Sequence, residues 1–230
     1  MQKNIIITGA SRGIGKELAK QFLEKGHNVL AISRNEEKLK ELYAYQNNSQ
    51  LLILPMDISK SGDLDMIPGA LRNWERVDLL YNNAGYLVNK PFAEVTAADL
   101  DYSIAVNYKA PFQIIQLILN KMDGNSHIVN ITTMGAVQGS VKFAGLSAYS
   151  SSKAGILTLT ELLAQEFNSN QPRINCIALG AVQTEMLEEA FPGYQAPIMP
   201  DEMANYLMDF GLRGHHFQNG KIIQLSTTTP

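Results

Sequence analysis

Tyr149 and Lys153 stand four residues apart in the segment Tyr-Ser-Ser-Ser-Lys. In a helix this spacing places both side chains on one face. A free phenol has a pKa of about 10 and is a poor base near pH 7, but a neighbouring ammonium favours the phenolate and lowers that pKa. Tuned in this way, Tyr149 can give a proton to a forming alkoxide or take one from an alcohol. Alone, the pair is a weak signal, because such pairs also occur on ordinary helix surfaces.

A carbonyl oxygen at this tyrosine needs a second hydrogen-bond donor. Two hydroxyls, Thr132 and Thr133, end the apolar run that precedes the helix of Tyr149. A threonine hydroxyl can donate to a carbonyl oxygen. The sequence therefore offers a phenol, a cation and a hydroxyl for hydride-transfer chemistry on a carbonyl or alcohol.

A glycine-rich turn, Thr8-Gly9-Ala10-Ser11-Arg12-Gly13-Ile14-Gly15, opens the same chain. It lies between a strand-like run and a helix-like segment, where glycine permits a tight turn and the helix N-terminus attracts a phosphate. Its spacing, Gly-x3-Gly-x-Gly, differs from the Gly-x-Gly-x2-Gly of most dinucleotide-binding folds. Taken with Tyr149 and Lys153, the turn predicts a nicotinamide-dependent oxidoreductase.

The second strand-like run ends at Ser33-Arg34, where NAD-preferring sites hold a carboxylate for the ribose 2′-hydroxyl. Arg34 and Arg12 bring two guanidinium groups instead, and arginine binds phosphate through two parallel hydrogen bonds. This favours NADP(H) over NAD(H). The alternative is that both arginines are solvated, or that Glu36 or Glu37 pairs with Arg34.

The rest of the chain alternates strand-like and helix-like segments. We predict strands near 3–8, 27–33, 50–56, 77–82, 126–132, 173–179 and 220–225. We predict helices near 13–25, 35–46, 61–73, 97–122, 149–168 and 201–211, with Thr96 to Asp99 as a capping box. Several strands lack polar alternation, which is typical of sheets covered on both faces. The prediction is an α/β, Rossmann-like, doubly wound fold with seven parallel strands flanked by helices on both faces.

Composition excludes several other classes of protein. The chain has 230 residues, 45% of them hydrophobic, and a net charge of −3, which gives no electrostatic footprint for nucleic acid. No apolar run is long enough to span a bilayer, and the N-terminus shows no signal peptide. The single cysteine, Cys176, permits no intramolecular disulfide, which fits a cytoplasmic protein. The four histidines form no cluster with metal spacing, so we expect no metal. We expect one domain over residues 1–230.

Considered together, these motifs resemble the short-chain dehydrogenase/reductase family in its single-domain form, over nearly the whole chain. The resemblance implies that Tyr149 is the acid/base, that Lys153 lowers its pKa and binds ribose, and that Thr133 polarises the carbonyl. It implies that Asn107, in Val-Asn-Tyr, holds a water in a proton relay to the lysine. The cofactor residues that it implies are Gly9, Ser11, Arg12, Gly13, Ile14, Gly15, Arg34, Asp57, Ile58, Asn83, Ala84, Gly85, Tyr149, Lys153, Val182 and Thr184.

The chain departs from the family pattern at four places. Thr133 stands at the family's serine position, with Thr132 and Ser140 as fallback candidates. Leu179 replaces the family's proline before Gly180, Ser226-Thr227 replaces a Gly-Gly ending, and the segment that forms the substrate lid after Thr184 is short.

The predicted function is an NADP(H)-dependent carbonyl reductase or alcohol dehydrogenase acting on a small molecule, with no nucleic-acid or membrane partner. One alternative is a 3-oxoacyl-[acyl-carrier-protein] reductase. Another is a weakly catalytic NADP(H)-binding sensor or scaffold, which the departures motivate. From the family's usual assembly we expect a homodimer or homotetramer formed through the helices at 97–122 and 149–168.

Overall fold

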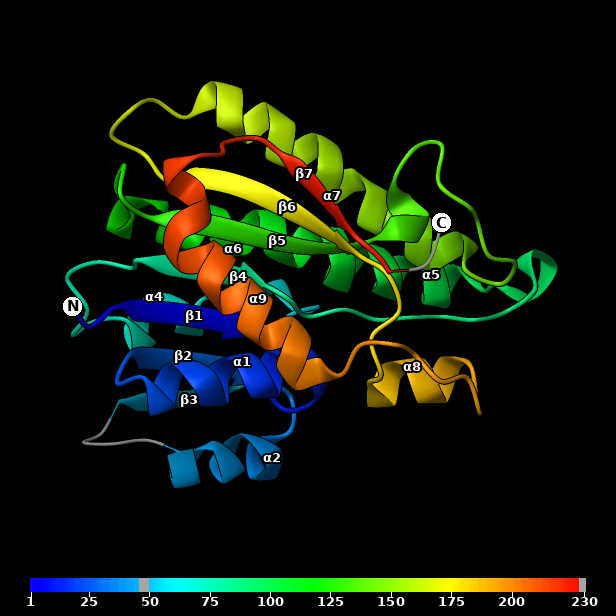
Figure 1. The fold of residues 1–230 in the computed structure, drawn as a ribbon, viewed down its shortest axis with the longest axis horizontal. Helices are drawn as coiled ribbons and strands as arrows, with labels where there is room; N and C mark the ends of the chain where they lie inside the picture. The colour runs from blue at the N-terminus through cyan, green and yellow to red at the C-terminus, as the bar shows by residue number, and fades with distance from the viewer. Residues whose placement is uncertain (46–49, 228–230) are drawn as a thin grey trace.

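The structure is a computed structural model that describes residues 1–45 and 50–227. Seven parallel strands form one sheet in the order β3-β2-β1-β4-β5-β6-β7 (Figure 1). They are β1 (Asn4–Thr8), β2 (Asn28–Ser33), β3 (Leu51–Pro55), β4 (Leu79–Asn82), β5 (His127–Thr133), β6 (Arg173–Leu179) and β7 (Ile222–Leu225). The predicted Rossmann-like class and all seven strands are confirmed.

Both faces of the sheet are buried, as the continuous apolar strands predicted. Ile5 and Ile7 of β1 point to one face, where they pack with Leu18 and Leu207. Ile6, between them in sequence, points to the other face and packs with Ile114. All six side chains have no exposed surface. Successive side chains of a strand alternate between faces, so one apolar run serves two cores.

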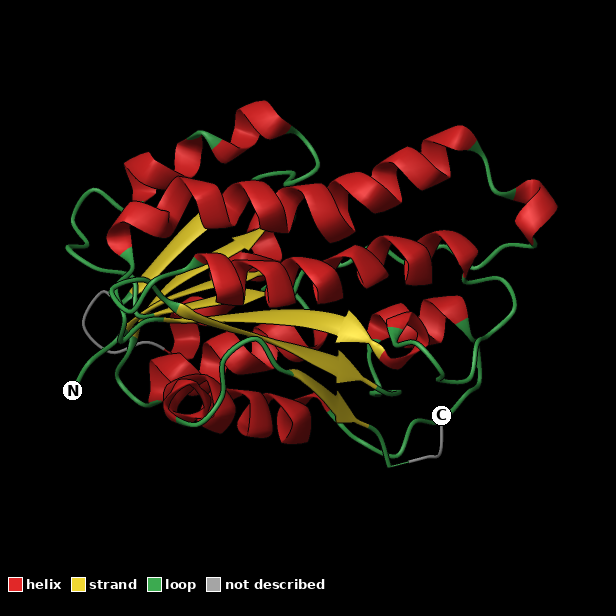
Figure 2. Cartoon of the chain, turned by 90° about the horizontal axis from the view of Figure 1, so that it is seen from above, coloured by secondary structure: helices red, strands yellow, loops and turns green. Residues whose placement is uncertain are grey.

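Helices cover both faces (Figure 2). The first core lies under α1 (Gly13–Glu24) and α9 (Pro200–Arg213), which pack against each other. The second lies under α4 (Met66–Ala70), α6 (Ala110–Ile118) and part of α7 (Ser147–Glu166). The remaining helices are α2 (Glu36–Lys40), α3 (Ser61–Leu64), α5 (Ala97–Ile104) and α8 (Glu185–Ala190). The capping box at Thr96 and Asp99 is confirmed at the start of α5.

The helix predicted at 61–73 is wrong as one element. It is split into α3 and α4. The imide nitrogen of Pro68 has no hydrogen to donate to the carbonyl of Leu64, four residues earlier, so the helix breaks between them.

The helix predicted at 35–46 is also interrupted. It comprises α2 and a 3₁₀ segment, Glu41–Tyr45, and residue 46 lies outside the described residues. Leu39 and Leu42 are both fully buried. Leu39 lies in α2 and Leu42 in the 3₁₀ segment, so the buried face continues across the change of pitch.

The helix predicted at 97–122 contains a change of pitch. Between α5 and α6 the residues Ala105–Lys109 form a π-helical turn, in which the Ala110 N–H donates to the Ala105 carbonyl five residues earlier. A 3₁₀ turn, Leu119–Lys121, follows α6. Pro111 explains the widened turn, since it cannot donate to the carbonyl of Asn107. Widened turns of this kind are frequent at functional sites.

Across residues 1–45 and 50–227, no helix has both the length and the apolar composition needed to cross a membrane.

Candidate active site

A cavity of about 520 Å³ opens beyond the carboxyl ends of β1, β2, β4, β5 and β6. This is where open α/β sheets bind ligands, at the switch in strand order beside β1. The predicted site residues that line the cavity are Gly9, Ser11, Arg12, Gly13, Ile14, Gly15, Arg34, Asp57, Ile58, Asn83, Ala84, Gly85, Thr133, Tyr149, Lys153, Val182 and Thr184. Asn107 does not line it.

The glycine-rich turn joins β1 to α1 at one wall of this cavity. Gly9 and Gly13 have φ values of 72° and 53°, which disfavour other residues. A Cβ on Gly15 would lie 2.3 Å from the Gly9 carbonyl oxygen. Arg12, the residue before α1, contributes no side-chain cap to its N-terminus. The first N–H groups of this 12-residue helix therefore face the cavity as donors, which fits a pyrophosphate.

Neither arginine of the predicted 2′-phosphate site is fully solvated. Arg34 donates from Nη1 to the Tyr102 hydroxyl at 2.9 Å, whereas Glu36 and Glu37 pair with Lys40. Arg12 forms an ion pair with Glu189 of α8. The hydrogen bond between them raises the pKa of Arg12 and lowers the pKa of Glu189.

Serine side chains occupy the place where a carboxylate would bind a ribose 2′-hydroxyl. The Ser33 hydroxyl lies 2.7 Å from that of Ser11, so the two hydroxyls are hydrogen-bonded. Asp57, after β3, accepts from the Ser59 N–H at 3.0 Å and lies 3.5 Å from the Tyr102 hydroxyl. Partial burial acts in the opposite direction, but the Ser59 hydrogen bonds and the charge of Arg34 lower the pKa of Asp57.

Asn83 fastens the end of β4 to the end of β1. Its Nδ2 donates to the Thr8 carbonyl at 3.0 Å, and its backbone N–H donates to the Thr8 hydroxyl at 3.1 Å. Ala84 makes a second backbone hydrogen bond to the same hydroxyl at 3.0 Å. These bonds fix the Asn83-Ala84-Gly85 segment against the glycine-rich turn.

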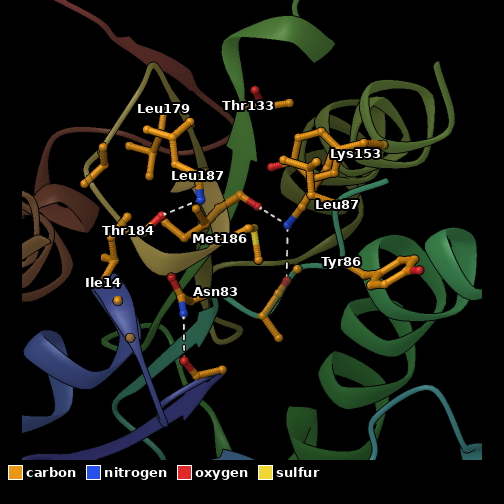
Figure 3. A pocket seen from close by; sticks show the side chains of 18 of the residues that line it. Ile14, Asn83, Tyr86, Leu87, Thr133, Lys153, Leu179, Thr184, Met186 and Leu187 are labelled. Atoms are coloured by element: carbon orange, nitrogen blue, oxygen red, sulfur yellow. Dashed lines mark hydrogen bonds between the residues drawn. The ribbon is translucent and has the colours of Figure 1, made fainter. Parts of the chain in front are cut away.

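Tyr149 and Lys153 both lie in α7 and line the cavity, as the four-residue spacing predicted. The Lys153 Nζ donates to the carbonyls of Ile131, at 2.9 Å, and Ala84, at 3.2 Å (Figure 3). Burial lowers the pKa of Lys153 to about 8 and raises the pKa of Tyr149 to about 12. The phenol is therefore protonated near neutral pH. The expected lowering of its pKa by Lys153 is not found, because burial dominates.

Three hydroxyls were considered as the partner of a substrate carbonyl oxygen. Of these, only that of Thr133 both lines the cavity and keeps its hydrogen free to donate to a substrate. Its Oγ1 accepts the Gly135 N–H at 3.3 Å, an arrangement that leaves its own hydrogen to donate elsewhere. Thr132 is buried, and its hydroxyl donates to the Lys153 carbonyl at 3.0 Å. Ser140 donates to the carbonyls of Met134 and Val137 and does not line the cavity.

Asn107 lies behind the cavity wall in the π-helical turn, fully buried. Its Oδ1 accepts the Tyr86 N–H at 2.8 Å, and its Nδ2 donates to the Tyr86 carbonyl and to the Ser152 hydroxyl, each at 2.9 Å. The side chain thus joins the segment after β4 to the helix that carries Lys153.

The short segment after β6 contains a helix that the sequence did not predict, α8, begun by Thr184. The Thr184 hydroxyl accepts the Leu187 N–H at 3.3 Å, and Figure 3 shows Met186 and Leu187 beside it. Glu189 of α8 and Tyr102 of α5, both bound to predicted cofactor residues, were missed. They lie 177 and 68 residues from their partners Arg12 and Arg34, and no sequence motif marks either.

Comparison with known proteins agrees with this geometry. A family model described as short chain dehydrogenase matches residues 3–195. Dehydrogenase/reductase SDR family member 6 from Xenopus laevis is 34% identical over 188 residues, 81% of this chain and 74% of that protein. An NAD-dependent glycerol dehydrogenase from Listeria innocua is 30% identical over 194 residues, 83% of this chain and 75% of that protein.

Solved structures show the same fold. A 3-ketoacyl-(acyl-carrier-protein) reductase from Brucella melitensis, complexed with NADH, has a TM-score of 0.84 at 23% identity, covering 97% of this chain and 96% of that one. Levodione reductase has a TM-score of 0.85 at 22% identity, with the same coverage of both chains. The family model over residues 3–195 and the 34% identical relative show that the chain belongs to the short-chain dehydrogenase/reductase family and is an oxidoreductase that acts on CH–OH groups.

Proposed function

We propose that the protein is an NADP(H)-dependent carbonyl reductase or alcohol dehydrogenase. The observation that carries the proposal is the meeting of Tyr149, Lys153 and Thr133 in one cavity with the uncapped N-terminus of α1. The first three groups suit proton transfer at a carbonyl oxygen, and the helix terminus suits a dinucleotide phosphate.

Each side chain has one task in this proposal. When bound, the nicotinamide supplies or accepts the hydride. Tyr149, protonated near neutral pH, donates its proton to the oxygen of a carbonyl that is being reduced. Thr133 donates a hydrogen bond to the same oxygen and stabilises its growing negative charge. Lys153 supplies the positive charge next to the ribose, and Asn107 and Ser152 hold the segment around it.

The NADP(H) preference rests on Arg34, together with Ser33, Ser11 and Arg12. Arg34 is exposed, lines the cavity and donates from one nitrogen to the Tyr102 hydroxyl, so its guanidinium keeps donors for a 2′-phosphate. The hydroxyl pair of Ser11 and Ser33 offers no carboxylate to repel that phosphate.

The first test is to titrate the purified protein with NADPH and NADH separately and to measure each dissociation constant from the change in nucleotide fluorescence. We expect NADPH to bind much more tightly. Loss of a hydrogen bond to a charged group costs about 1.5–3 kcal/mol, so Arg34→Ala should weaken NADPH binding roughly 10- to 100-fold and leave NADH binding unchanged. Arg72→Ala, an exposed arginine away from the cavity, is the control. Equal or tighter binding of NADH by the unaltered protein would reject the NADP(H) assignment.

The second test addresses the chemistry. Tyr149→Phe removes only the phenolic hydroxyl and should abolish NADPH oxidation across a panel of ketones and aldehydes, while nucleotide binding persists. Equal rates for the variant and the wild type would reject Tyr149 as the acid/base. Nucleotide binding without turnover by the wild type on any carbonyl would favour the sensor or scaffold alternative.

We also propose a homodimer or homotetramer formed through α5–α6 and α7. Exposed apolar side chains on these helices support it, namely Leu100, Ile104, Phe112 and Leu162, which are 37–60% exposed. The molar mass from size-exclusion chromatography with light scattering tests this proposal, and a monomer at micromolar concentration would contradict it.

A further inference from the structure

The same cavity also has apolar lining residues near Tyr149, and we call the part that they enclose the apolar chamber. Its walls come from the segment after β5, with Met134, Phe143 and Leu146, and from α8 and the loop after it, with Leu187, Phe191 and Tyr194. Leu146 immediately precedes α7, one helical turn before Tyr149. Tyr149 and Thr133 line the same cavity as these side chains, so a group attached to a carbonyl at Tyr149 has room among them.

The charges of the cavity are unevenly distributed. Among the described residues that line it, the carboxylates and cations are Arg12, Arg34, Asp57, Lys153 and Glu185. Arg34 and Asp57 both lie at Tyr102, at the nucleotide end. Arg12 belongs to the glycine-rich turn, and a Glu185 carboxylate oxygen lies 3.6 Å from an ideal Cβ on Gly13 in that turn. Lys153 is directed at two backbone carbonyls. The apolar chamber itself therefore contains no cation for a substrate carboxylate or phosphate.

Two lysines close to the chamber walls, one beside Phe143 and one in the segment that is hydrogen-bonded to Gly145, are bound elsewhere. Lys90 donates to Asp99 at 2.7 Å, and Lys142 donates to the Ser140 hydroxyl at 2.8 Å and to the Val137 carbonyl. Neither lines the cavity. Transfer of an unpaired carboxylate into an apolar site costs several kcal/mol, so these walls select against an anionic substrate.

The chamber walls are fastened to each other. Asn89 donates from Nδ2 to the Ala190 carbonyl at the end of α8, at 2.8 Å, and Lys90 N–H donates to the Gly145 carbonyl at 3.0 Å. Gly145 has a φ of 87°, and a Cβ there would lie 2.0 Å from the Asn89 Oδ1. The segment at 87–90 is thus hydrogen-bonded to both walls and holds them in place relative to each other.

Two large apolar side chains stand exposed at the rim of the chamber. Phe143 is 58% exposed and Tyr194 is 45% exposed. Exposed apolar surface gathered around a cavity marks a place where an apolar ligand is covered on binding. We propose that the substrate is an uncharged ketone, or the corresponding secondary alcohol, with a hydrophobic chain or ring that fills this chamber. This inference rests on the proposed function and narrows its substrate class.

Two ketone series test the proposal. Methyl ketones from 2-butanone to 2-decanone vary the apolar chain, and 9-oxodecanoate matches 2-decanone in length but ends in a carboxylate. We expect kcat/KM with NADPH to rise by up to about fourfold per added methylene, the factor that corresponds to its transfer into an apolar site. We expect 9-oxodecanoate to be at least tenfold poorer than 2-decanone. Equal or better turnover of the carboxylate would overturn the proposal.

Three variants locate the effect. Phe143→Ser should reduce the increase in kcat/KM per added methylene. Phe143→Arg should reduce the ratio of kcat/KM for 2-decanone to that for 9-oxodecanoate at least tenfold. Phe217→Ser, at a phenylalanine that is 86% exposed and does not line the cavity, should change neither quantity. Unchanged selectivity in both Phe143 variants would mean that the substrate does not occupy this chamber.

A binding measurement separates this inference from the proposed function. Calorimetry of 2-alkanols from butanol to decanol, and of 9-hydroxydecanoate, with the NADPH-loaded protein, a complex that cannot transfer hydride, should show affinity that rises with chain length, with a negative heat-capacity change. Such binding without turnover would keep the chamber assignment and reject the catalytic proposal. Affinity that does not depend on chain length, or that favours the carboxylate, would reject the chamber assignment even if ketones are reduced.

Discussion

Arg12 of the glycine-rich turn and Glu189 of α8 form a two-pronged ion pair, in which Nη1 bonds Oε1 and Nη2 lies 3.1 Å from Oε2. The pair links the cofactor turn to the segment over the cavity. A 2′-phosphate near Arg12 would compete with Glu189 for the same guanidinium. The pair is partly exposed, so its own contribution is small, about 0.2–1 kcal/mol.

Glu189→Gln should therefore strengthen NADPH binding by up to about fivefold, the factor equivalent to 1 kcal/mol, and leave NADH binding unchanged. Fluorescence titration with both nucleotides measures this. In an Arg12→Ala variant, Glu189→Gln should not change NADPH affinity, because the guanidinium that the substitution would free from its ion pair is absent. Weaker NADPH binding in Glu189→Gln would show instead that the ion pair helps to hold the nucleotide.

Asn107 provides a prediction about positioning. Asn107→Leu leaves the N–H and carbonyl of Tyr86 without their partner. Each unsatisfied buried polar group costs about 1–3 kcal/mol. At about 2–4 °C per kcal/mol for a chain of this size, the melting temperature should fall by several degrees. The turnover rate should fall by more than the fraction of unfolded protein accounts for, because the segment from Ala84 to Tyr86 also accepts a hydrogen bond from Lys153.

Asn130→Leu is the matched control for Asn107→Leu. Asn130 is equally buried and bonds Asn82 and Thr160 at 2.8 Å and 2.9 Å. Its loss should lower the melting temperature comparably. Assayed well below their melting temperatures, only the Asn107 variant should have impaired turnover. The same deficit in both variants would reduce Asn107 to a purely structural residue.

The sequence predicts the strands and turns whose structure depends on residues adjacent in the chain. Continuous apolar runs such as Ile5 to Ile7 predict the buried parallel strands, and the glycines from Gly9 to Gly15 predict the turn. The helix break before Pro68 and the widened turn before Pro111 follow from the missing N–H of proline, but a prediction from hydrophobic period alone does not find them. Tertiary pairs such as Arg12 with Glu189 cannot be predicted in this way, since they depend on how distant segments pack.

The pKa values show the same limit. From spacing alone, Lys153 is expected to lower the pKa of Tyr149. In the fold, burial acts on both groups, raising the pKa of Tyr149 and lowering that of Lys153. Burial is a property of the whole packed chain, and a four-residue motif does not contain it.

The lowered pKa of Lys153, about 8, predicts a pH dependence of nucleotide binding. Below pH 8 the ammonium is charged and attracts the anionic dinucleotide, and above pH 8 that charge is lost while Arg12 and Arg34 stay protonated. NADPH affinity should therefore decrease as the pH rises from 7 to 9.5. Lys153→Met should bind more weakly at pH 7 and lose this dependence. A wild-type affinity that is constant over the range would contradict the prediction.

His127 predicts how stability changes in acid. Its ring is buried, with Nδ1 donating to the Gly211 carbonyl at 3.0 Å and Nε2 accepting from the Asn175 Nδ2 at 2.9 Å. Asn175 cannot rotate to accept a proton from Nε2, since its Nδ2 also donates to the Gln218 carbonyl and its Oδ1 accepts the Lys221 N–H. Burial is the main cause that lowers the pKa of His127 to about 3, with His215 and His216 acting in the same direction and the Gly211 hydrogen bond acting against it.

A pKa that is depressed in the folded protein means that the unfolded chain takes up the proton first. The stabilisation is complete above the unfolded pKa of about 6.5 and is lost as the pH falls toward 3, at up to about 1.4 kcal/mol per pH unit. Urea unfolding between pH 7 and 4.5 should therefore show a steeper loss of unfolding free energy in the wild type than in His127→Gln, whose amide can bond both Gly211 and Asn175. Parallel curves for the two proteins would mean that His127 takes up a proton in the folded state, which the fixed orientation of Asn175 opposes.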